Sequence, residues 1–86
     1  MDVESFEEAF WELEHIRIVV RADRDEEIAN DYDFKRALEN GKTVTDLKRL
    51  RIEPCLENLE YELYDGSFDQ PHGRTKLGTV RDSYED

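Results

Sequence analysis

Few side chains in this chain can perform covalent or acid–base chemistry. Cys55 is the single cysteine, and His15 and His72 are the two histidines. A thiol and an imidazole, with Asp69 to orient the ring, would supply a nucleophile and a general base. No sequence motif supports that arrangement, and a cysteine beside Leu56 is more often a small buried apolar residue. We therefore expect no catalytic residue and no enzymatic activity.

Carboxylates, which hard cations prefer as ligands, are concentrated between residues 23 and 33. An EF-hand loop requires a central glycine, and this stretch contains none. One thiol and two distant histidines also lack the spacing of a zinc site. Glycine-rich phosphate loops, HExxH helices and nucleophile elbows are absent. We expect a solvated acidic turn, with no metal and no cofactor; its acids are Asp23, Asp25, Glu26, Glu27, Asp31 and Asp33.

The charge of the chain is unevenly distributed. Twenty-three acids against twelve bases give a formal net charge of −11 in 86 residues. Such a charge disfavours nucleic acid and anionic lipid as direct partners and favours basic proteins. Residues 1–33 sum to −9, residues 34–56 to +3, residues 57–70 to −5 and residues 71–86 to zero. The basic middle either neutralises its acidic neighbours inside the fold or leaves acids free for a partner.

Length and apolar content limit the class of protein. Eighty-six residues predict one domain over residues 1–86. A lone cysteine forms no internal disulfide, so a reducing, cytoplasmic compartment is expected. The acidic N-terminus lacks the features of a secretory signal, and the longest apolar run, IRIVV, is far shorter than a membrane helix.

The N-terminal segment predicts a helix. Ser5 and Glu8 have the form of a capping box, and Phe6 and Phe10 recur at helical spacing. Trp11 lies off this apolar stripe. It indicates either a wider buried face or an exposed aromatic residue at a contact surface.

Three runs predict strands, at residues 16–22, 48–53 and 59–64, because polar and apolar residues alternate in each. Two alternatives stay open. The first helix would continue through 16–22, or Thr45 would cap a short helix within residues 43–50. The strand interpretation of 48–53 gains weight from Pro54, which is expected to stop a regular helix.

The second and third runs have complementary polar faces. As a hairpin, they would place Arg49 and Arg51 opposite Glu60 and Glu62. Glu60 and Glu62 would then be structural residues, and the acids at the hairpin ends would remain free for a partner.

The predicted fold is a two-layer α+β domain, in which a three-stranded antiparallel sheet is packed against an N-terminal helix and a central helix. Residues 26–38 predict the central helix, which Asn40 and Gly41 would end. It is either continuous or interrupted near residues 30–33, where Asp33 would be a new N-cap. Residues 67–86 are expected to form a loop or a weakly ordered tail.

Acids at i and i+4 on a helix lie about 6 Å apart, and such rows suit a basic groove built for a nucleic-acid backbone. The alternative is that the acids only maintain solubility. The candidate partner-binding residues are Glu7, Glu8, Glu12, Glu14, Asp25, Glu26, Glu27, Glu57, Asp65 and Asp69.

In size, charge and lack of catalytic motifs, the chain resembles small phage-encoded inhibitors such as anti-CRISPR proteins and the uracil-DNA glycosylase inhibitor, and also bacteriocin immunity proteins. The resemblance implies that the chain binds and blocks a basic nucleic-acid-binding protein or nuclease, as anti-CRISPR or anti-restriction proteins do, by mimicking nucleic-acid charge. A toxin immunity protein and a phage structural or assembly component are the alternatives. A small nucleic-acid-binding domain built on ENGKTVTDLKRLRI is less favoured, and monomer and dimer both remain open.

Overall fold

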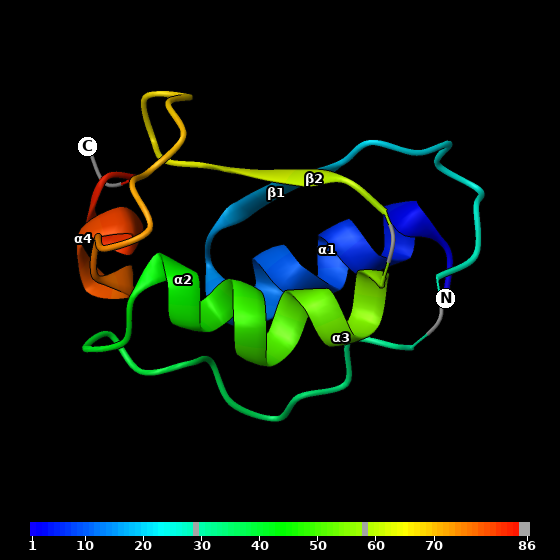
Figure 1. Cartoon of the computed structure of the whole chain (residues 1–86), viewed down its shortest axis with the longest axis horizontal. Coiled ribbons are helices and arrows are strands. Elements are labelled where there is room, and N and C mark those ends of the chain that lie inside the picture. The colour runs from blue at the N-terminus through cyan, green and yellow to red at the C-terminus, as the bar shows by residue number, and fades with distance from the viewer. Residues whose placement is uncertain (29, 58, 85–86) are drawn as a thin grey trace.

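An N-terminal helix, a two-stranded ribbon and a helical rod are the main regular elements of the fold (Figure 1). The computed structural model describes residues 1–28, 30–57 and 59–84. The rod consists of three consecutive helical segments, and a last short helix lies near the end of the rod at which it begins (Figure 1). In chain order the elements are α1 (Val3–Glu14), β1 (Arg17–Val20), α2 (Val44–Leu47), η1 (Lys48–Ile52), α3 (Glu53–Leu56), β2 (Tyr61–Tyr64) and α4 (Leu77–Asp82).

The predicted N-terminal helix is confirmed as α1, which begins earlier than the capping-box pattern indicated. The side chain of Asp2 accepts a hydrogen bond of 2.8 Å from the Ser5 N–H, so Asp2 is the N-cap. One apolar stripe of α1 enters a core shared by all the elements. The core residues that are at most 1% exposed are Val3, Phe6, Phe10, Ile16, Val44, Leu47, Ile52 and Leu77.

The sheet contains two strands within the described residues. β1 and β2 lie antiparallel, and Ile18 is opposite Leu63, with both side chains buried. They fall inside the predicted 16–22 and 59–64 runs. The α+β class therefore holds, whereas the prediction of a third strand is wrong.

The predicted strand at residues 48–53 is helical instead. Thr43 and Asp46 form a reciprocal capping box, in which each side chain accepts a hydrogen bond from the main chain of the other residue. A helix therefore begins at α2, two residues earlier than Thr45 would have placed it, and continues directly into η1 and α3.

The middle of the rod, η1, is a π-helical turn. Leu47 and Ile52 are both fully buried although they are five positions apart, whereas Leu50 is 56% exposed. A turn with an extra residue explains this spacing, which neither a strand nor a regular α-helix produces. The α-helix resumes at Glu53, and Pro54 then lies in the first turn of α3, a position at which proline is tolerated.

The pairing predicted between Arg51 and the acids of the 59–64 run is also wrong. Glu62 instead forms an ion pair with Arg21, which follows β1. Hydrogen bonds from Tyr64 and Arg21 hold the pKa of Glu62 below its usual range. Arg51 points from the rod to Glu14, with Nη1 2.5 Å from the carboxylate oxygen.

The predicted central helix over 26–38 is not present in the described part of that range. The described residues of this segment form irregular backbone on the outside of the molecule, anchored to the core by Ile28 and Tyr32, both of which are buried. Its main chain bonds to the N-terminal segment and to side chains of other elements. The N–H of Leu38, for example, donates to Glu14 Oε1 at 2.9 Å.

Residues 67–84, part of the segment expected to be a loop or weakly ordered tail, include α4. Leu77 and Val80 of α4 are buried in the core. Thr43 and Lys76 form an isolated antiparallel bridge, so the chain leading into α4 lies beside the start of the rod.

Candidate functional site

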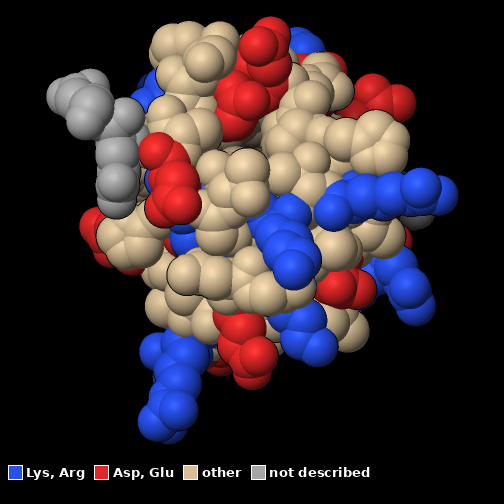
Figure 2. All heavy atoms as spheres, turned by 90° about the vertical axis from the view of Figure 1, so that its left-hand side faces the viewer, with Lys and Arg blue, Asp and Glu red and all other residues tan. Residues whose placement is uncertain are grey.

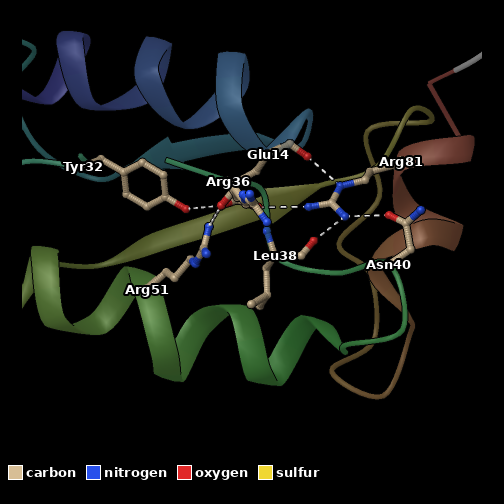
Figure 3. A network of polar contacts seen from close by, with 7 residues as sticks. All are labelled: Glu14, Tyr32, Arg36, Leu38, Asn40, Arg51 and Arg81. Carbon is tan, nitrogen blue, oxygen red and sulfur yellow. Dashed lines mark hydrogen bonds and ion pairs between the residues drawn. The ribbon is translucent and has the colours of Figure 1, made fainter. Parts of the chain in front are cut away.

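Glu14 lies at the centre of a buried polar network, shown in Figure 3. Its side chain is 0% exposed. Oε2 accepts hydrogen bonds from the Tyr32 hydroxyl and from Arg51 Nη1, each at 2.5 Å. Oε1 accepts from Arg81 Nη2 at 2.9 Å. A carboxylate enclosed by its own chain cannot contact a partner, so the prediction that Glu14 is a contact residue is wrong.

The two arginines of this network also bind main-chain carbonyls. Arg51 donates to the carbonyl of Arg36 at 2.6 Å, and Arg81 donates to that of Leu38 at 2.6 Å. Burial, together with the hydrogen bond to Glu14, raises the pKa of Tyr32 far above its usual value. The network thus ties α1, the irregular segment, the rod and α4 together, and its role is structural.

The residues considered for nucleophilic chemistry are not brought together. Cys55 is buried, and burial, reinforced by Asp33 and Asp31, raises the pKa of its thiol. His15 is exposed in left-handed backbone at the end of α1, and His72 is an exposed loop residue. No contact joins Cys55 to either histidine among the residues that the structure describes.

One end of the molecule gathers several of the predicted acids. The loop after β1 bonds to the first turn of α1 through Val3 N to Glu26 O at 3.0 Å, and Asp2 bridges to Glu27. The following segment is tied to α3 by Asn30 Nδ2, which donates to a main-chain oxygen of the rod at 2.8 Å. Figure 1 shows the N-terminus and the end of α3 at this same end. We call it the acidic end; its predicted contact residues are Asp25, Glu26, Glu27 and Glu57, all exposed.

Asp65 and Asp69 do not belong to the acidic end. Their loop lies next to α4, where the Gly66 N–H donates to Ser83 Oγ at 2.8 Å. Asp65 Oδ1 accepts from the N–H of Ser67 at 2.8 Å and from that of Asp69 at 3.0 Å. The carboxylate of Asp65 is therefore used to shape the loop, and Asp69 is exposed on it.

The outer face of α1 carries a row of exposed acids spaced four residues apart: Glu4, Glu8 and Glu12. We call these three residues the acidic row. None of them forms an ion pair within the described ranges 1–28, 30–57 and 59–84. Glu7, which directly precedes Glu8, is half-buried and accepts a hydrogen bond of 2.9 Å from the Val20 N–H.

An aromatic cluster lies beside the acidic row. The guanidinium carbon of Arg17 is 5.7 Å from the ring centroid of Trp11 and 5.2 Å from that of Phe68. Tyr84 meets Trp11 edge to face at 5.2 Å. Trp11 is 39% exposed and Phe68 67% exposed. The aromatic cluster consists of Trp11, Phe68 and Tyr84, and it draws on three distant parts of the chain.

Phe68 adopts a backbone conformation that bulky residues rarely take, with φ at 64°. Such conformations cost free energy and are found disproportionately at functional sites. Here the conformation belongs to the residue whose ring lies against Arg17. Trp11, off the apolar stripe, was recognisable from the sequence as a contact candidate, whereas nothing in the sequence places Arg17 and Phe68 next to it.

A surface hollow of about 310 Å³ runs between α1 and β1. Its lining consists of three acids of α1 (Glu4, Glu7 and Glu8) together with Trp11, Arg17, Ile18 and Arg24. The hollow therefore combines an apolar surface with carboxylates, and it connects the acidic row to the aromatic cluster.

The opposite end of the molecule carries basic side chains. Figure 2 views the molecule from the end that bears α4 and shows several lysine and arginine side chains projecting there alongside acidic ones. Lys42, Arg74 and Lys76 are exposed, and the bridge between Thr43 and Lys76 brings their segments together. This end therefore presents cations from two separate parts of the chain.

Comparison with protein-family models, with curated proteins and with solved structures finds no match to this chain. Among the described residues, no helix is long and apolar enough to cross a bilayer. In the same part of the chain, no three His, Cys, Asp or Glu side chains are placed to share a metal ion.

The strongest candidate site is the surface formed by the acidic row, the hollow and the aromatic cluster.

Proposed function

We propose that this chain is a binding protein that blocks a basic nucleic-acid-binding protein or nuclease by presenting nucleic-acid-like negative charge. The observation that carries the proposal is the acidic row, Glu4, Glu8 and Glu12, whose carboxylates are exposed and form no ion pair within the described residues. Unpaired like charges destabilise their own helix, and a basic partner would offset that cost.

The acidic row places like charges at regular intervals along α1. Glu4 and Glu12 are eight positions apart, so the row is about 12 Å long and carries one carboxylate every 6 Å or so. One strand of B-DNA carries a charge every 3.4 Å or so along its axis, so the row has roughly half the linear charge density of a strand. A basic groove that fits a strand would therefore find a regular line of negative charge along α1, and the acidic end extends the negative surface.

The aromatic cluster adds the second element of a specific interface. Interface centres are enriched in Trp, Tyr and Arg, and a few such residues carry most of the binding free energy. Trp11 and Tyr84 of the aromatic cluster fit this composition. In the proposal, the acidic row speeds and orients the encounter, and the aromatic cluster determines how long the complex lasts.

The proposal assigns no reaction to the chain and places it in the cytoplasm. It requires no cofactor. Its partner is a basic protein, which competes with nucleic acid for the same groove.

The test is capture of basic proteins by the immobilised chain at low and high salt, followed by nucleic-acid binding assays on what is captured. We expect the chain to abolish nucleic-acid binding by the captured protein. The triple variant of the acidic row, with glutamine at each position, should lose at least tenfold in affinity. A matched triple variant at Glu39, Glu53 and Glu60, which are exposed on other parts of the chain, removes the same charge and should lose less. Equal losses of affinity in the two variants would show that only net charge matters and would contradict the proposal.

A further inference from the structure

The guanidinium of Arg17 lies between two exposed aromatic rings. Its carbon is 5.7 Å from the Trp11 centroid and 5.2 Å from the Phe68 centroid. Both distances fall within the range of a cation–π contact. The rings come from the last turns of α1 and from the loop after β2, so the fold brings two aromatic rings from distant parts of the chain against one cation. We call these two rings the aromatic cage.

Only the side chain of Arg17 depends on this cage. Its main chain is fixed by the pairing of Arg17 with Tyr64 and by the Arg17 N–H, which donates to the Tyr84 hydroxyl at 2.9 Å. Within the described residues, the guanidinium itself makes no hydrogen bond and no ion pair. The side chain can therefore leave the cage without disturbing the sheet.

We infer that the aromatic cage of Trp11 and Phe68 is a binding site for an arginine side chain of the basic partner, and that Arg17 occupies this site until the partner displaces it. The inference rests on the proposed function, because it names the partner group that the aromatic cluster receives. The occupant is argued from the guanidinium already seen between the rings and from the charge of the approach to them.

The hollow between α1 and β1 supplies that approach. It is lined by Trp11 and Arg17 and also by Glu4 and Glu8 of the acidic row. An incoming arginine would lay its aliphatic stem on Ile18 and Trp11 and meet the carboxylates with its charged end. Once Arg17 has swung out, those carboxylates would face one cation fewer from their own chain.

The experiment measures binding of a fluorescein-labelled hepta-arginine peptide by anisotropy, with a hepta-citrulline peptide as the uncharged isostere. Trp11 is the single tryptophan, so its fluorescence reports on the cage directly. The Arg17→Gln variant should bind the arginine peptide about two- to fivefold tighter than the parent, the range expected of one exposed cation–π contact. Phe68→Ala should bind it more weakly, and the citrulline peptide should leave Trp11 fluorescence unchanged.

Arg24→Gln is the matched control, because Arg24 lines the same hollow, is exposed and carries the same charge. It makes no cation–π contact among the described residues. A gain in affinity at Arg17 that exceeds the gain at Arg24 supports displacement. Equal gains, or weaker binding by Arg17→Gln, overturn it, since Arg17 would then be a passive charge or a direct partner contact.

The two proposals fail in different ways. If a captured basic protein loses its nucleic-acid binding but hepta-arginine leaves Trp11 unchanged, the cage inference is wrong and the proposed function stands. If hepta-arginine binds as described but no basic protein is retained at low salt, the cage exists and the proposed function is wrong.

Discussion

Arg81 holds Glu14 by two groups at once: its Nη2 donates to Glu14 Oε1 at 2.9 Å, and its Nε donates to the Glu14 main-chain oxygen at 2.7 Å. The second contact satisfies a carbonyl at the end of α1, a position where a cation also favours the helix dipole. The same guanidinium bonds to the carbonyl of Leu38. One side chain of α4 thereby binds the C-terminal end of α1 and also holds the irregular segment beside it.

The variant Glu14→Gln should be severely destabilised. It preserves volume but leaves Arg51 and Arg81 without the carboxylate that neutralises them, and breaking a buried pair in this way costs about 3–5 kcal/mol. Urea denaturation followed by circular dichroism measures the loss. Glu12→Gln, on the exposed face of the same helix, should change the free energy of unfolding by about 0.5 kcal/mol or less. Similar values for the two variants would mean that Glu14 is not buried as an ion.

Charge reversal at Arg49 and at Arg51 distinguishes the helical rod of the structure from the hairpin that the sequence predicted. Arg51→Glu would bring a second carboxylate against Glu14, so we expect a loss of several kcal/mol and a clear fall in Tm. Arg49 is exposed and makes no ion pair within the described residues, so Arg49→Glu should be nearly neutral. A hairpin would make both reversals costly, and thermal melts of the two variants therefore decide between the arrangements.

Gly66 should not tolerate a side chain. A Cβ at this position would lie 1.9 Å from the main-chain oxygen of Ser83, which is backbone and cannot move aside cheaply. Gly66→Ala is expected to lose about 1–3 kcal/mol, which lowers Tm by about 4 °C or more in a domain of this size. Gly41→Ala is the control, because a Cβ there has nothing within 4 Å. If both variants melt like the parent, the loop after β2 does not lie against α4.

The raised pKa values of four tyrosines predict a loss of folding stability at alkaline pH. Burial raises the pKa of Tyr61 to about 12, and burial also raises the pKa of Tyr32 and of Tyr84. A hydrogen bond to Glu62 raises the pKa of Tyr64. Unfolded tyrosines ionise near pH 10, so this contribution to stability is complete below about pH 10. It is lost as the pH rises toward 12, because ionisation then favours the unfolded chain.

Tyrosinate absorbance, followed against pH with and without denaturant, checks this prediction. The folded protein should titrate at higher pH than the denatured protein. Coincident titration curves would show that the tyrosines are solvated in the folded state. Tyr32→Phe should also reduce the difference between the two curves, since Tyr32 contributes one of the shifted groups.

The elements with regular periodicity were predictable from sequence. The α1 helix follows from Phe6 and Phe10 at helical spacing, and β1 follows from β-branched residues in alternation. The rod was mistaken for a strand because its π turn shifts Ile52 out of the helical pattern and its Pro54 resembles a helix stop. The start of the rod is nevertheless encoded locally, because Thr43 and Asp46 form the capping box that begins the helix.

The candidate site was predictable only in part. Exposed acids on α1 follow from spacing, and Trp11 was conspicuous because it lies off the apolar stripe. Glu14 gave no sign of burial, because its partners, Arg51 and Arg81, come from remote segments. The contact of Arg17 with Phe68 depends on a loop conformation with positive φ, which propensities assign to glycine or asparagine rather than to phenylalanine.

The span of the Glu14–Arg81 pair has a kinetic consequence. The two residues are 67 positions apart in the chain. A ribosome that adds about 5–20 residues per second makes Arg81 roughly 3–13 s after Glu14. During that interval α1 carries a carboxylate that cannot yet be buried with both of its arginines. The native core is therefore expected to close late, as a single event once α4 has been made, and nascent chains stalled before α4 should be selectively sensitive to proteases.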